Sequence, residues 1–73
     1  MQVRVMNRVY SMSRKKYQGL LKVASEQVPF GIYAVEKNEY AELRNDCCHS
    51  RSQLKELVRA FKGQGFKVYK NEG

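Results

Sequence analysis

The sequence predicts a small α+β domain, and three observations lead to that class. Apolar and polar residues alternate in several stretches, as they do in half-buried strands. Between these stretches lie two runs in which apolar residues recur every three or four positions, as in amphipathic helices. The chain has 73 residues, of which 42% are hydrophobic and 29% charged, with one Pro and five Gly. This size and composition predict one domain over residues 1–73 and exclude low-complexity disorder.

The first strand is expected over Gln2–Met12, with a bulge at Asn7. Ser13 is a favourable N-cap for the helix that follows, and Pro29 ends that helix close to Gln27. The apolar stripe of this helix follows the spacing i, i+3, i+4, i+7 and i+11, and consists of Tyr17, Leu20, Leu21, Ala24 and Val28.

Two further strands are expected over Phe30–Lys37 and Tyr40–Cys48, joined by the turn Asn38-Glu39. A two-residue loop at this turn pairs Ala34 with Leu43. The same register pairs Tyr33 with Arg44.

Ser50 is expected to begin the second helix, with Gln53 completing a capping box, and Gly63 to end it. The apolar stripe of this helix consists of Leu54, Leu57, Val58 and Phe61. A last strand is expected over Phe66–Lys70, with residues 71–73 frayed.

This β-α-β-β-α-β order, combined with right-handed crossovers, predicts a four-stranded antiparallel sheet with both helices on one face. The arrangement is the ferredoxin-like split βαβ fold. Because side chains alternate along a strand, the other face of the sheet is then left bare.

The bare face is expected to carry tyrosines interleaved with basic side chains. Rings that stack on bases and cations that neutralise phosphates suit RNA or single-stranded DNA. The same face would suit a partner protein, or self-association as a homodimer. The predicted contact residues are Arg4, Arg8, Tyr10, Tyr33, Tyr40, Arg44, Lys67 and Tyr69.

A second basic surface is expected on the outer side of the second helix, where four cations recur at i, i+4, i+8 and i+11. Such a row suits a phosphate backbone or an acidic protein surface, and it is also common on a merely solvated helix face. The row consists of Arg51, Lys55, Arg59 and Lys62.

The charge balance favours a polyanionic partner. Fourteen Lys and Arg stand against seven Asp and Glu, which gives a net charge of +7. Residues 1–22 carry six of the basic residues and no acid. A chain of this kind attracts nucleic acid, acidic protein surfaces or anionic lipid head groups, and charge alone does not choose among them. No apolar run approaches the length of about 20 residues that a membrane span needs, and we expect a cytoplasmic protein. We expect no membrane contact through the second helix either, because the apolar side of that helix is needed for the core.

The residues that carry enzyme chemistry are sparse, so we expect a binding module rather than an enzyme. Cys47, Cys48 and His49 are consecutive, and neighbours in a strand point to opposite faces. One His and one Cys pair do not supply the spaced ligands of a zinc site. We therefore expect no catalytic residues, no metal and no cofactor.

The order of elements resembles that of RNA-recognition motifs, whose first and third strands carry stacking aromatics. Here the first strand has Arg4 where that family has an aromatic residue, and the segment Tyr40–Asn45 lacks the basic–Gly–aromatic pattern. The resemblance is one of fold order, not of motif.

The short basic chain, with its run Gly63-Gln64-Gly65-Phe66-Lys67-Val68-Tyr69, is similar to small uncharacterised basic proteins of Bacillus-type phages and prophages. This resemblance implies a non-enzymatic protein in the host cytoplasm that binds, and inhibits or modulates, a host enzyme or defence component. It implies no particular site residues.

Overall fold

The computed structural model describes all residues, 1–73, as one mixed sheet of five strands with two helices, in the order ββαββαβ. The α+β class is confirmed, whereas the sheet is neither four-stranded nor fully antiparallel. No helix is long and apolar enough to cross a membrane. The elements are β1 (Gln2–Val5), β2 (Arg8–Ser11), α1 (Arg14–Gln27), β3 (Phe30–Lys37), β4 (Tyr40–Cys47), α2 (Arg51–Gly63) and β5 (Lys67–Glu72).

The expected first strand is in fact a hairpin. The chain turns at Met6 and Asn7, so that β1 and β2 pair antiparallel, with Val3 opposite Tyr10 and Arg4 opposite Val9. Met6 has a φ of 58°, a left-handed conformation that is uncommon for a large side chain. The sequence at this point lacks the Gly that is typical of such a turn.

The strand order is β2-β1-β4-β3-β5, with β1 parallel to β4 and every other neighbouring pair antiparallel. The last strand therefore lies beside β3, whereas a ferredoxin-like sheet would place it beside the first. The predicted pairing of Ala34 with Leu43 is confirmed. The predicted pairing of Tyr33 with Arg44 is wrong, because the register of β3 shifts between Ile32 and Ala34.

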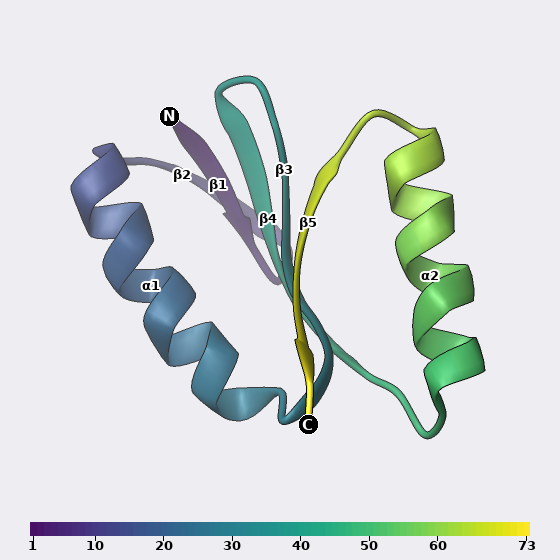
Figure 1. Cartoon of the computed structure of the whole chain (residues 1–73). Coiled ribbons are helices and arrows are strands. Elements are labelled where there is room, and N and C mark those ends of the chain that lie inside the picture. Colours follow the sequence, from purple (N-terminus) through teal and green to yellow (C-terminus); the bar gives the residue numbers. More distant parts are fainter.

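The two helices lie on opposite faces of the sheet, as Figure 1 shows with the strands between them. Both crossovers, β2–α1–β3 and β4–α2–β5, advance across the sheet in the same direction. They start from strands that point in opposite directions, because β2 is antiparallel to β1 and β1 is parallel to β4. Two right-handed crossovers of this kind place their helices on opposite faces. The expectation of both helices on one face is wrong for this reason.

Each face therefore has its own core. On the α1 side, Tyr17 packs with Val3 and Ala41. On the α2 side, Ile32 and Val35 of β3 pack with Leu54, Val58 and Cys48. Val35 is fully buried, so the face of the sheet that was expected to be bare is covered by α2.

Both helices begin as the sequence predicts. The hydroxyl of Ser13 accepts a hydrogen bond from Lys16 N, and that of Ser50 accepts one from Gln53 N. The side chain of Gln53 reaches one residue further back than in a capping box, since its Oε1 accepts from His49 N.

The C-terminal part of the chain differs from the expectation in two details. Gly63 is still helical, and the left-handed residue after α2 is Gly65, with a φ of 90°. The expected fraying of residues 71–73 is wrong for Asn71 and Glu72, which belong to β5. Asn71 Nδ2 donates to the carbonyl oxygens of Ser25 and Val28, both at 2.9 Å, which ties β5 to the end of α1.

Candidate functional site

The eight residues predicted to share one bare face do not come together. The β1–β2 register places Tyr10 opposite Val3 and Arg8 opposite Val5, and Val3 belongs to the α1-side core. Residues that pair directly across two strands share a face of the sheet, so Arg8 and Tyr10 lie on the same face as Val3. Arg4 points to the other face. The eight residues divide into three groups. Arg8 and Tyr10 lie on β2. Arg4, Tyr40 and Arg44 lie on the α2 side of β1 and β4, whereas Tyr33, Lys67 and Tyr69 lie on β3 and β5.

Three of these residues form a small cluster near the β5 edge. The ring centroids of Tyr33 and Tyr69 are 6.1 Å apart, and Lys67 Nζ lies 5.0 Å from the Tyr69 ring. The Tyr69 hydroxyl donates to Glu36 Oε2 at 3.0 Å, so this ring is held within the fold. A stacking platform that extends across the sheet is absent.

Arg44 is also occupied within the fold. It forms ion pairs with Glu42, at 2.6 Å, and with Asp46. Its guanidinium carbon lies 4.8 Å from the centroid of the Phe61 ring on α2. These contacts join β4 to α2 and leave little free charge for a ligand.

Glu36 is the centre of a polar cluster that the sequence did not indicate. Its carboxylate accepts hydrogen bonds from Tyr17 and Tyr69 and pairs with Arg14 at 3.1 Å, which connects α1, β3 and β5. Burial raises the pKa of Glu36, but the hydrogen bonds from Arg14, Tyr69 and Tyr17 outweigh burial, so its pKa is lowered overall. Burial, followed by the nearby Glu36 charge, raises the pKa of Tyr17.

Glu36 should make the stability of the domain depend on pH. Because its pKa is lowered on folding, the carboxylate stabilises the fold above its ordinary pKa, and this contribution is lost as the pH falls through the lowered value. We expect Glu36→Gln to reduce the free energy of unfolding by about 2 kcal/mol at neutral pH, as for hydrogen bonds to charged groups. Urea denaturation of both proteins from neutral pH to about pH 3 should show the difference shrinking.

The matched control for this prediction is Glu26→Gln, an exposed acid of α1 that makes no ion pair. Its substitution should change stability by less than about 0.5 kcal/mol. A gap between wild type and Glu36→Gln that stays constant down to low pH would contradict the assigned role of the carboxylate.

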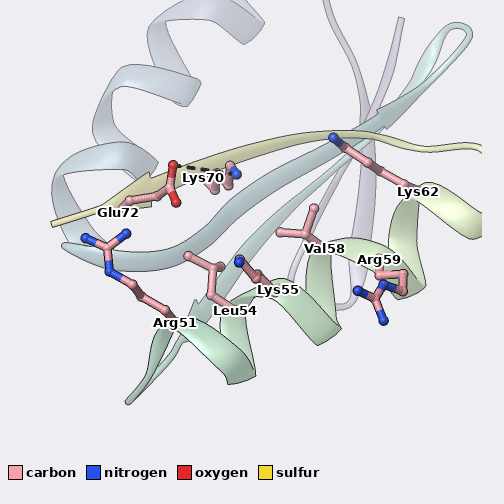
Figure 2. Close-up of a pocket in the computed structure, with 8 residues that line it drawn as sticks. All are labelled: Arg51, Leu54, Lys55, Val58, Arg59, Lys62, Lys70 and Glu72. Atoms are coloured by element: carbon pink, nitrogen blue, oxygen red, sulfur yellow. Dashed lines mark ion pairs between the residues drawn. The ribbon is translucent and has the colours of Figure 1, made fainter.

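The four cations of the second predicted surface do lie together, on α2 beside β5. With Lys70 and Glu72 of β5 they line a groove of about 330 Å³ whose floor contains Leu54 and Val58 (Figure 2). Arg51 and Lys62 extend from the helix toward the strand, whereas Arg59 turns away from it. The lining cations are Arg51, Lys55, Arg59, Lys62 and Lys70.

The helix cations of this groove have no carboxylate partner. None of the four forms an ion pair, and the ion pair in the groove joins Lys70 to Glu72, at 3.6 Å on β5 itself. All four side chains are exposed. They recur at about one turn of helix, or roughly 5–6 Å, and so form a row of uncompensated positive charge.

Lys70 and Glu72 were not predicted to belong to the basic surface on α2. Residues 71–73 were expected to fray, and the last strand was expected at the other edge of the sheet. One signal for Lys70 was available in the sequence. It lies two positions after Val68, which packs on the α2-side core, and alternation places the two side chains on one face.

The cysteines show no arrangement for chemistry. Cys47 is exposed, Cys48 is buried, and both are free. Burial raises the pKa of the Cys48 thiol, which disfavours the reactive thiolate. No group of three or more His, Cys, Asp or Glu side chains lies close enough together to hold a metal ion.

Comparisons with protein-family models, with curated proteins and with solved structures find no match to this chain. Function is therefore inferred from the residues of the chain itself. The groove between α2 and β5 can hold an extended polyanion by charge, with a short apolar floor beneath it.

Proposed function

We propose that the protein is a non-enzymatic nucleic-acid-binding module that holds the phosphate backbone of RNA or single-stranded DNA in the groove between α2 and β5. The observation that supports this proposal is the row of four exposed cations on α2 without carboxylate partners. Phosphate contacts of this kind supply most of the affinity of sequence-independent binding.

The composition of the groove favours contacts to the backbone over contacts to the bases. No aromatic residue lines it, so bases have no ring on which to stack. Lysine and arginine side chains of an exposed helix reach phosphates without fixing base identity. Binding is therefore expected to show little sequence preference and strong dependence on salt.

The test is fluorescence anisotropy with a labelled single-stranded oligonucleotide at several salt concentrations. If about four phosphates are neutralised, the slope of log affinity against log salt should be about −3, from about −0.7 for each contact. The double variant Arg51→Gln/Lys55→Gln should bind about tenfold more weakly or worse, with a slope smaller in magnitude by about 1.4.

The matched control is Lys15→Gln/Lys16→Gln, which removes the same charge from exposed positions on α1, away from the groove. If both double variants weakened oligonucleotide binding equally, the oligonucleotide would be attracted by the net charge of the protein in general. That result would refute the groove as the binding site. Absence of binding at low salt would refute nucleic-acid binding.

A second candidate for the same groove is an acidic surface of a host protein, as for a phage-type protein that inhibits or modulates its target. The absence of an aromatic ring from the groove and the apolar floor of Leu54 and Val58 favour this alternative. A single partner protein that is retained after nuclease treatment, and lost with Arg51→Gln/Lys55→Gln, would support it over nucleic acid.

A further inference from the structure

The edge strand β2 is exposed along its whole length. All four of its residues, Arg8 to Ser11, are exposed, and β2 pairs with β1 on one side only. Val9 is 50% exposed and Tyr10 46%, and Met6 at the preceding turn is 86% exposed. Open strand edges are templates for pairing with another chain.

The other edge of the sheet is protected in ways that β2 is not. β5 carries Lys67 and Lys70, and lysines on an edge strand oppose pairing with a second strand. The β2 segment contains no Lys and no Pro, and its pairing with β1 has no register shift. The edge at β2 is therefore the one suited to strand addition.

Symmetry restricts how two copies of β2 could pair. Two adjacent antiparallel strands of identical chains are related by a twofold axis perpendicular to the sheet, so residues opposite each other must share a face. The axis must then pass between two copies of the same residue. Within β2 the central choices are Val9 and Tyr10.

The register centred on Val9 is self-complementary. It places Val9 opposite the partner's Val9 on one face of the sheet. On the other face it places Arg8 opposite the partner's Tyr10, and the symmetry repeats this pair with the two chains exchanged. A guanidinium beside a tyrosine ring is attractive, and a β-branched pair is favourable in a cross-strand position. The register centred on Tyr10 instead sets Tyr10 opposite the partner's Tyr10, which is one favourable aromatic pair. It also sets Arg8 opposite the partner's Met12 and Val9 opposite the partner's Ser11, so that both arginine–tyrosine pairings are lost.

We propose that the protein forms a homodimer by antiparallel pairing of β2 with β2 of a second copy, centred on Val9. The two five-stranded sheets then become one continuous sheet. Because the axis is perpendicular to the sheet, both copies of α2 lie on the same face, with their grooves near the two far edges. If the proposed function is correct, one polyanion could contact both grooves.

Sedimentation equilibrium over a range of protein concentrations, without nucleic acid, tests the dimer. The variant Val9→Lys sets two like charges opposite each other at the axis and should weaken dimerisation at least tenfold. Ser11→Lys, on the same exposed strand, faces only the turn residue Asn7 of the partner and should change dimerisation less than threefold. Wild-type protein that stays monomeric at all concentrations, or equal effects of the two variants, would overturn the proposal.

Cysteine cross-linking tests the register independently of affinity. In a Cys47→Ser background, Val9→Cys should form an intermolecular disulfide on mild oxidation, because directly opposite strand residues have Cα atoms about 4.5–5.5 Å apart. Tyr10→Cys in the same background should cross-link at least tenfold more slowly. Preferential cross-linking of Tyr10→Cys would overturn the Val9-centred register. Neither test depends on what the groove binds.

Discussion

Replacing Gly31 with Ala should destabilise the protein by roughly 3–5 kcal/mol, which is a large part of the whole stability of a chain this small. Gly31 lies inside β3, where it pairs with Cys47 of β4 and Asn71 of β5. Its φ of 149° is a conformation that other residues rarely adopt, and a Cβ placed there would lie 2.0 Å from the carbonyl oxygen of Asp46. Neighbouring strands on both sides prevent the backbone from moving away.

Urea denaturation followed by circular dichroism measures this effect. Gly19→Ala is the matched control, because nothing lies within 4 Å of the added Cβ and the residue is inside α1. That variant should be more stable than wild type by up to about 1 kcal/mol, through helix propensity. A Gly31→Ala protein that unfolds at the wild-type urea concentration would contradict the close approach of β3 and β4.

Truncation of Tyr17 to Ala should cost about 3–5 kcal/mol, the usual range for removing a buried aromatic side chain. Tyr17 is only 1% exposed and is the largest of the fully buried side chains. It fills the α1-side core against Val3 and Ala41. Removing the ring would leave a cavity between α1 and the sheet in this core.

Tyr17→Phe separates the ring from its hydroxyl. The phenylalanine keeps the packing but loses the 3.3 Å hydrogen bond to Glu36, which retains its contacts with Arg14 and Tyr69. We expect a cost of about 1 kcal/mol, measured by the same denaturation. Equal costs for the two substitutions would show that the hydroxyl, and not packing, carries the contribution.

The local elements could be predicted from the sequence because their signals are local. Helical spacing, the N-caps Ser13 and Ser50, and the turn at Asn38 identified both helices and the β3–β4 hairpin. The β1–β2 hairpin could not be predicted from the sequence, because its turn places Met6 in a left-handed conformation and contains no Gly. Alternation continued through Asn7 as if the strand were unbroken.

The arrangement of the elements depends on pairing between distant segments, which periodicity does not report. An amphipathic strand pattern predicts that one face of the strand is buried. β3 is buried on both faces, because Ile32, Ala34 and Val35 are each fully buried. No bare face is therefore left for the predicted tyrosines, and the turn at Met6 and Asn7 also moves Tyr10 to the face opposite the one expected. The row on α2 was predictable because a single helix fixes it, whereas the contribution of Lys70 required the position of β5.

The placement of the sheet between α1 and α2 has a practical consequence for experiments. A fluorophore, affinity tag or surface tether attached at Gln18, an exposed position on α1, would be separated from the α2 groove by the full thickness of the sheet. Such an attachment site leaves the groove unobstructed, so immobilised protein should report the affinity of the free molecule.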